Sequence, residues 1–196
     1  MVKLSQSIAA TMQRRVLCIE CGSAEVDSRP PAAYFCDRCG ASRPRAVVID
    51  PVVKWWTAAD GEYWHQSVGI FLRNSAGAYL VFRRTRFPFG LTIPAGHVHV
   101  SEVPAVAARR ELQEETALAI DDLQSLDNVD VVGDSCRRGA DAHHWNCFLA
   151  QVDGYPEVKI NEEGVEPSWL QLDGMLRHSE MVPATSFLIK HHRERL

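Results

Sequence analysis

Four of the six cysteines in this 196-residue chain lie within 22 residues, and their spacing limits what that stretch can fold into. The pattern is Cys18-x2-Cys21, fourteen residues, then Cys36-x2-Cys39, with a glycine after each pair. Such paired cysteines present four thiolates to one tetrahedral ion, and glycine eases the tight backbone behind each pair. A segment this short buries too little apolar surface to fold on its own, so a metal replaces a core. The spacing predicts one structural Zn²⁺ in a zinc ribbon.

The alternative for these cysteines is two disulfide or redox pairs, and the expected compartment decides against it. Residues 1–10 lack the apolar core of a signal peptide, and no stretch approaches the ~18 apolar residues that span a membrane. We therefore expect a cytoplasmic protein without a membrane segment, in which thiols stay reduced. Cys136 and Cys147 lie outside the pattern and are interpreted as a loop thiol and a buried strand residue.

The composition is that of a globular protein, with 46% hydrophobic and 23% charged residues, which excludes disordered and fibrous folds. A net charge of −4 argues against a mainly electrostatic nucleic-acid binder. We expect four parts along the chain: a helical segment at 1–15, the zinc ribbon at 16–45, a linker or connecting strand at 46–62, and an α/β domain at 63–196.

Hydrophobic patterning and turn residues place the expected elements of the α/β domain. A helix is expected from Pro104 to about Thr116, because proline suits the first helical turn, and a closing helix over 184–195. One strand over 46–56 should connect the ribbon, with Trp55 and Trp56 packing it against the domain. The remaining strands are expected at 67–73, 78–84, 91–93, 129–132, 145–152 and 168–172.

Three carboxylates crowd one face of the predicted helix. Glu111, Glu114 and Glu115 are spaced i, i+3 and i+4, and their mutual repulsion costs stability in an isolated helix. Divalent cations with a preference for oxygen ligands, such as Mg²⁺ or Mn²⁺, would neutralise this charge. Arg110 lies four residues before Glu114 and is placed to pair with it. A solvated charged face is the alternative interpretation of the helix taken alone.

The surrounding spacing resembles the Nudix box, Gly-x5-Glu-x7-Arg-Glu-U-x-Glu-Glu-x-Gly-U, in which U is a bulky aliphatic residue. Gly96, Glu102 and the run from Arg110 to Leu118 follow this pattern, and one fixed position differs because Ala117 replaces the second glycine. That glycine ends the helix, where a left-handed residue is favoured. The resemblance implies a Nudix α/β/α sandwich with a mixed sheet over about 63–196, with the zinc ribbon in front of it.

The resemblance also implies an activity: hydrolysis, dependent on Mg²⁺ or Mn²⁺, of the diphosphate linkage in a nucleoside diphosphate joined to another group. The implied metal ligands are Glu111, Glu114, Glu115 and the carbonyl of Gly96, and Glu102 stabilises the loop or an outer metal. Arg110 orients the carboxylates. The general base is a box glutamate, Glu111 or Glu114, or a glutamate of a later loop such as Glu163. The resemblance also makes a homodimer an expectation, because Nudix domains often pair.

Phosphate contacts are expected from cations at the end of the hairpin, and an aromatic ring next to them would stack on a base. The substrate-binding candidates are Arg83, Arg84, Arg86 and Phe87. Substrate choice is expected to depend on the loops at 83–90 and 133–144. Four histidines near these segments are interpreted as ordinary surface or core residues rather than ligands: His97, His99, His143 and His144.

Three other functions stay open. NADH pyrophosphatases also join a zinc ribbon to a Nudix domain, but the Ser-Gln-Pro-Trp-type motif that marks them is absent after the box. Isoprenoid diphosphate isomerases share the fold but usually lack an intact box. The third is a non-catalytic ligand sensor whose ribbon binds protein or nucleic acid, since residues 14–45 carry six basic against four acidic residues. Retention of every box carboxylate favours catalysis over sensing.

Overall fold

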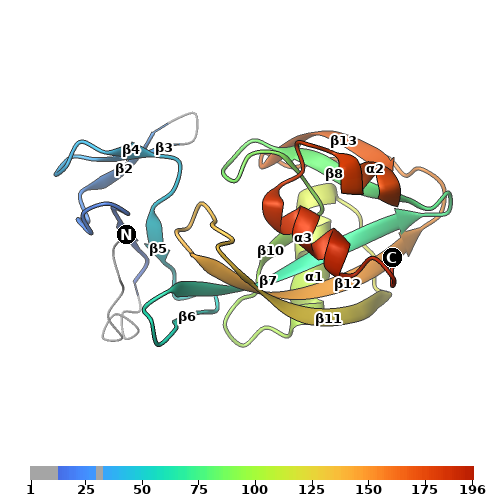
Figure 1. Cartoon of the computed structure of the whole chain (residues 1–196), viewed down its shortest axis with the longest axis horizontal. Coiled ribbons are helices and arrows are strands. Elements are labelled where there is room, and N and C mark those ends of the chain that lie inside the picture. The colour runs from blue at the N-terminus through green and yellow to red at the C-terminus, as the bar shows by residue number, and fades with distance from the viewer. Residues whose placement is uncertain (1–12, 30–32) are drawn as a thin grey trace.

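The computed structural model of the chain describes residues 13–29 and 33–196 (Figure 1). The predicted helix at 1–15 therefore lies outside the described residues except at its end, where Arg15 begins strand β1. No helix among the described residues combines the length and apolarity needed to cross a bilayer.

The cysteine-rich segment forms two small antiparallel sheets at one end of the molecule (Figure 1). The first contains β2 (Val26–Arg29), β3 (Ala33–Cys36) and β4 (Ser42–Arg43). In the second, β1 (Arg15–Leu17) pairs with β5 (Val47–Ile49). The strands bring the two Cys-x2-Cys turns together, and the core beneath them is small, as the sequence predicts.

A mixed sheet of eight strands occupies the rest of the described chain, in the order β11-β12-β7-β8-β13, with β6 and β10 also paired to β7 and β9 to β8. The strand β12 runs parallel to β7, and the other pairs are antiparallel. The strands are β6 (Trp55–Thr57), β7 (Tyr63–Asn74), β8 (Ala78–Arg84), β9 (Leu91–Thr92), β10 (Ala95–His97), β11 (Leu123–Val132), β12 (Ala142–Val152) and β13 (Gly164–Gln171).

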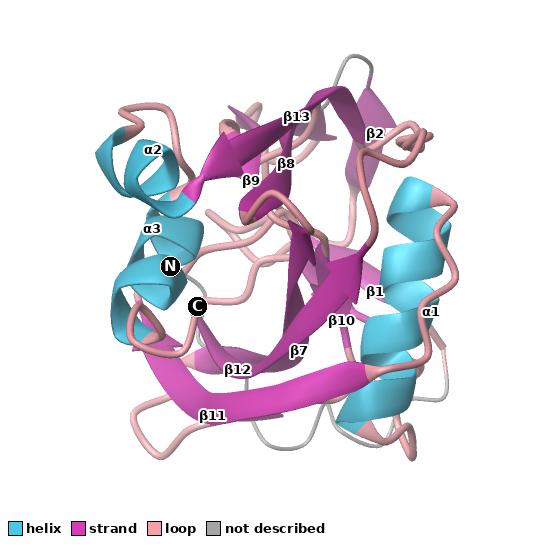
Figure 2. Cartoon of the chain, turned by 90° about the vertical axis from the view of Figure 1, so that its right-hand side faces the viewer, coloured by secondary structure: helices cyan, strands magenta, loops and turns pink. Residues whose placement is uncertain are grey.

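Helices cover both faces of this sheet. Figure 2 shows α1 (Pro104–Thr116) on one side and α2 (Leu172–Arg177) with α3 (Pro183–His191) on the other. Successive side chains of β7 point to opposite faces of the sheet, which explains the two cores. Ile70 packs in the cluster under α1, whereas its neighbour Phe71 packs in the cluster under α2 and α3. The predicted α/β/α sandwich is confirmed.

Several elements differ from the expectation, and the clearest cases are one strand, the closing helix and one helix that was not expected. The strand expected over 46–56 is two strands, β5 and β6, because Asp50 and Pro51 turn the chain between them. The closing helix starts at Pro183 and ends at His191 rather than at 195. The short helix α2 was not predicted, since six residues carry too little periodicity to be recognised.

Ala117 ends α1 in the left-handed conformation, with φ 61° and its N–H donating to the Gln113 carbonyl. Because a β-carbon disfavours this conformation, we expect Ala117→Gly to raise the free energy of unfolding by about 1 kcal/mol. Urea denaturation of both proteins measures this difference. Ala105→Gly, at a helical position of α1, is the control and should lower stability by about 1 kcal/mol. Destabilisation by Ala117→Gly would contradict the account of the helix end.

Candidate active site

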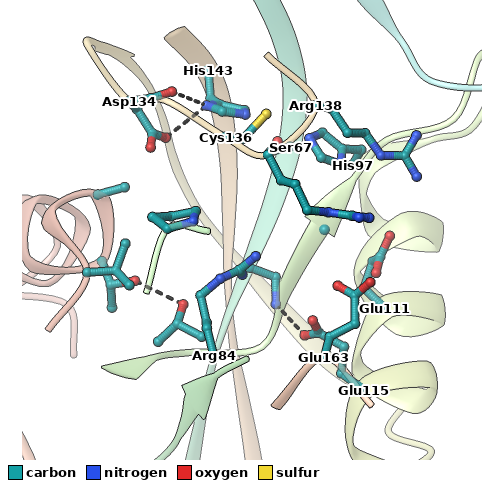
Figure 3. A pocket seen from close by; sticks show the side chains of 18 of the residues that line it. Ser67, Arg84, His97, Glu111, Glu115, Asp134, Cys136, Arg138, His143 and Glu163 are labelled. Carbon is teal, nitrogen blue, oxygen red and sulfur yellow. Dashed lines mark hydrogen bonds and ion pairs between the residues drawn. The ribbon is translucent and has the colours of Figure 1, made fainter. Parts of the chain in front are cut away.

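A cavity of about 380 Å³ lies against α1 (Figure 3). Its walls come from α1, β10, the loop between β11 and β12, and the loop before β13. The charged residues that line it include Arg84, Glu111, Glu115, Arg137, Arg138 and Glu163. The cavity therefore brings carboxylates and guanidinium groups together.

Two carboxylates of α1 lie at this cavity, and the side chain of the first, Glu111, is 14% exposed. Glu115 is 4% exposed and accepts a hydrogen bond of 2.7 Å from the Ala95 N–H. Burial raises its pKa to about 8, and burial also raises the pKa of Glu111 despite the nearby Arg110. Both shifts reflect the cost of a buried negative charge, which a bound divalent cation removes. The donor set fits the cation that the sequence predicts.

Gly96 lies directly against the Glu111 carboxylate, so a side chain at this position would displace that carboxylate. A β-carbon on Gly96 would lie 1.9 Å from the Cδ of Glu111, far inside van der Waals contact. Glycine thus allows the backbone of β10 to approach the carboxylate directly. This contact places the Gly96 backbone beside the carboxylates with which it is expected to share a metal.

Arg110 connects the box loop to the acidic face of α1. It donates to both oxygens of Glu102 at 2.9 Å, to Glu111 at 2.7 Å and to the His97 carbonyl at 3.1 Å. Glu102 also accepts from the His99 N–H at 2.9 Å, and the hydrogen bonds from Arg110 lower the pKa of Glu102. Of the two predicted roles for Glu102, these contacts support the stabilisation of the loop.

Glu114 and Glu163 occupy different parts of the site. The Glu114 side chain is 57% exposed and accepts from Arg110 at 3.2 Å. Glu163 lies in the loop before β13 and forms an ion pair of 2.5 Å with Arg86. Figure 3 shows its side chain next to those of Glu111 and Glu115. Asn161 attaches this loop to α1 by donating to the Glu114 and Glu115 carbonyls at 3.2 Å. The fold therefore brings both classes of predicted base to one cavity.

The three arginines of the hairpin do not share one environment. Arg84 lines the cavity, whereas Arg83 forms ion pairs with Glu166 at 3.1 Å and Glu180 at 3.0 Å. Successive side chains of β8 point to opposite faces, which separates these neighbours. Arg86 is engaged by Glu163, and the ring of Phe87 packs edge-on against Phe89, with 6.4 Å between the ring centroids.

Two arginines that sequence analysis missed, Arg137 and Arg138, also line the cavity. They lie in the 133–144 loop, which was expected to influence substrate choice, although no motif marks either residue. Three of the four histidines, His97, His99 and His143, line the cavity as well. The fourth, His144, is not part of this lining and contacts Asp130 at 2.6 Å.

The four ribbon cysteines converge as their spacing predicts. Cys18 Sγ lies 3.7 Å from Cys39 Sγ, and Cys21 Sγ lies 3.6 Å from Cys36 Sγ. Four thiolates bound to one Zn²⁺ at about 2.3 Å lie about 3.8 Å apart, so these separations fit a tetrahedral site. Behind each pair, Gly22 and Gly40 have φ values of 73° and 71°, which confirms why glycine follows the cysteines.

Comparison with known structures gives the same fold. The MutT protein from Methanosarcina mazei Go1 superposes with a TM-score of 0.57 at 22% identity, over 67% of this chain and 94% of that chain. The dihydroneopterin triphosphate pyrophosphohydrolase of E. coli has a TM-score of 0.56 at 16% identity, over 67% and 96% of the two chains. At these identities the likeness shows the fold alone.

A third similar structure is the Nudix domain of Shewanella oneidensis NrtR, complexed with ADP ribose. It has a TM-score of 0.54 at 22% identity, over 66% of this chain and 86% of that chain. No curated protein sequence matches the chain. The family model of the NUDIX domain matches residues 63–188, well over half of the sequence. Together with the fold, this match shows that the chain belongs to the Nudix hydrolase family.

Proposed function

We propose that this protein hydrolyses the diphosphate linkage of a nucleoside diphosphate joined to another group, with Mg²⁺ or Mn²⁺ held at α1. The observation that carries the proposal is the cavity lined by Glu111 and Glu115 on α1 together with Arg84, Arg137 and Arg138. A diphosphate needs cations for its oxygens and carboxylates for the metal that it shares with the enzyme. The cavity offers both within one volume.

Each residue has a part in the proposed reaction. Glu111, Glu115 and the Gly96 carbonyl would hold the cation, with Glu114 at the rim. A bound divalent cation neutralises phosphate charge and lowers the pKa of a coordinated water. Arg110 fixes Glu111 through its 2.7 Å hydrogen bond. Glu163, held by Arg86, is our choice of general base because it lines the same cavity but comes from a loop outside the box, and Glu111 and Glu114 are the alternatives.

Other parts of the proposal concern the setting of the enzyme. We propose that the ribbon binds one structural Zn²⁺ through its four cysteines, and that the protein works in the cytoplasm, where free thiols persist. ADP ribose bound to the Nudix domain of NrtR supports a nucleotide-type ligand here. A non-catalytic sensor would bind such a ligand without turnover.

The proposal is tested with the purified full chain, Mg²⁺ and a panel of nucleoside triphosphates, dinucleotides, ADP ribose and nucleotide sugars. Nucleotide products are separated by chromatography and inorganic phosphate is measured in parallel. We expect at least one member to be cleaved at its diphosphate. A folded protein that binds a member of the panel but cleaves none would instead support the sensor.

Arg84 and Arg83 form a matched pair for testing phosphate recognition. Arg84→Ala should raise the KM of the best substrate about tenfold to a hundredfold, which corresponds to about 1.4–2.8 kcal/mol of lost binding. Arg83→Ala removes the same charge from the adjacent residue, but its side chain pairs with Glu166 and Glu180. Its KM should stay within about threefold of the wild-type value. Equal effects of the two substitutions would contradict the proposed role of Arg84.

A further inference from the structure

Three histidines and a cysteine converge on the cavity wall away from the acidic helix. His65 comes from β7, His97 from the end of β10, Cys136 from the loop between β11 and β12, and His143 from β12. Each offers one ligand atom, and these atoms all lie within 4.8 Å of one another. Figure 3 shows the Cys136 sulfur beside the His143 imidazole, with His97 close by. Four separate segments of the chain thus meet at one point.

The spacing within this cluster approaches that of a tetrahedral metal site. Imidazole nitrogens at about 2.0–2.1 Å and a thiolate at about 2.3 Å from one Zn²⁺ lie about 3.3–3.6 Å apart. Cys136 Sγ is 3.7 Å from His65 Nδ1. The ring centroid of His65 is 4.7 Å from that of His97 and 5.7 Å from that of His143. The four ligand atoms all lie within 4.8 Å of one another, so the widest pair exceeds the tetrahedral spacing by about 1.5 Å at most.

The surroundings of His143 orient it as a ligand. Its Nδ1 lies 2.9 Å from the Asp134 carboxylate and 2.9 Å from the Asp134 carbonyl, which leaves Nε2 for the cluster. The same carboxylate accepts from Trp145 Nε1 at 2.8 Å, so it is held in place. Histidines that bind metals commonly donate their other N–H to a carboxylate or carbonyl in this way.

His65 gives independent evidence, because its burial is not compensated by ordinary hydrogen bonds. Its side chain is 0% exposed. Its Nδ1, the nitrogen that faces the cluster, contacts only the Cys136 sulfur, which is a weak hydrogen-bond partner. A metal ion bound at Nδ1 would give this buried nitrogen a strong partner.

We propose that His65, His97, Cys136 and His143 bind a second Zn²⁺, separate from the ribbon site and from the cation at α1. Three imidazoles and one thiolate suit Zn²⁺, whereas Mg²⁺ and Mn²⁺ prefer oxygen ligands. Cys136 binds as the thiolate and releases its proton to solvent on binding. All four positions are filled by protein, so the site is structural rather than catalytic.

The second site would fix the loop that carries Arg137 and Arg138. On its other side, this loop contacts the segment that leaves the ribbon. The Ala46 N–H donates to the Arg137 carbonyl at 3.2 Å, and the Val48 N–H donates to the Arg138 carbonyl at 2.9 Å. Two zinc-bound modules would therefore brace one wall of the cavity. The proposal does not depend on the hydrolytic function, and its test reads metal content rather than activity.

The first experiment counts the zinc bound by the full wild-type chain. The protein is loaded with Zn²⁺, then desalted into buffer containing Mg²⁺, so that the acidic helix holds Mg²⁺ and not Zn²⁺. We expect two zinc ions per chain by elemental analysis, one for each cluster. X-ray absorption at the zinc edge should then show a total of five sulfur and three imidazole ligands for the two ions together. One ion per chain with four sulfur ligands would overturn the proposal.

The second experiment removes ligands one at a time. Cys136→Ala and His143→Gln should each lower the content from two zinc ions to one and leave the ribbon ion bound. Cys147→Ala is the matched control, because Cys147 is a fully buried cysteine of β12 outside the cluster, and it should keep two. Retention of two ions by both ligand variants would overturn the proposal. The wild-type measurement stands even where a variant fails to fold.

Discussion

Glu111→Gln is expected to lower kcat for the best substrate about a thousandfold. The substitution keeps the shape of the side chain and an oxygen that accepts from Arg110, but it removes one negative charge from the cation site. A thousandfold loss corresponds to about 4 kcal/mol of transition-state stabilisation, the size expected for a disturbed metal site. Initial rates over a range of Mg²⁺ concentrations measure the effect.

The folded state should survive this change. Because burial disfavours the charged form of Glu111, as its raised pKa indicates, a neutral glutamine at this position costs no stability in metal-free protein. The melting temperature should therefore match the wild type. Glu157→Gln is the control, since Glu157 is exposed on a loop away from the cavity and should leave kcat unchanged. A Glu111→Gln enzyme within tenfold of the wild type would contradict the assignment of the metal site.

Cys36→Ala is expected to unfold the N-terminal module and to remove one zinc ion per chain. Cys36 is 2% exposed and its Sγ lies 3.6 Å from Cys21 Sγ, so no other side chain takes its place. Zinc binding contributes about 10–16 kcal/mol in small zinc-dependent folds, far more than the small core of this module supplies. Limited proteolysis should then cleave within residues 13–45, and elemental analysis gives the zinc content.

Hydrolysis should be weakened by the same substitution, not abolished. The acidic helix lies in the Nudix domain, outside the ribbon. The loop that carries Arg137 and Arg138, however, is held by β5 and by Arg45. Arg45 donates to the Gly139 carbonyl at 3.0 Å and to the Ala140 carbonyl at 2.9 Å. Loss of this support should raise KM more than it lowers kcat. Unchanged zinc content with an unchanged proteolysis pattern would contradict the ribbon assignment.

Local spacing explains which features the sequence could reveal. The four ribbon cysteines and the Nudix box are each read from one continuous stretch, because a turn or a helix fixes the geometry of residues a few positions apart. The same holds for the replacement of glycine by Ala117, which the structure confirms as a left-handed helix end.

Contacts between distant segments could not be read in this way. His65 and His143 are 78 positions apart and meet because β7 and β12 pair in parallel, with His65 directly opposite His143 in the register. No pattern in one sequence gives that register, so the sequence favours a loop thiol for Cys136 and an ordinary residue for His143, and it does not single out His65. The hairpin arginines show a related limit, because alternation separates Arg83 from Arg84 but does not say which of them faces the cavity.

The same limit applies to the role of the ribbon. Its cysteines predict a zinc module but not what the module touches. In the structure, β5 follows the ribbon, and its backbone forms hydrogen bonds with the loop at 137–141. Residues of the ribbon segment and of this loop also pack in one hydrophobic core, which includes Leu17, Val47 and Ala140. The ribbon is thus placed to support a wall of the cavity, which gives a physical reason for joining the two modules.

The central claim is that a divalent cation at α1 drives cleavage of a diphosphate, and one measurement tests it most directly. Turnover of the best substrate is followed in zinc-loaded protein freed of Mg²⁺ and Mn²⁺, and then as Mg²⁺ is added back. We predict no turnover before the addition and a saturable return of activity with Mg²⁺, absent in Glu111→Gln at the same concentrations. Turnover that is independent of Mg²⁺ and Mn²⁺, or that Glu111→Gln retains in full, would contradict the account.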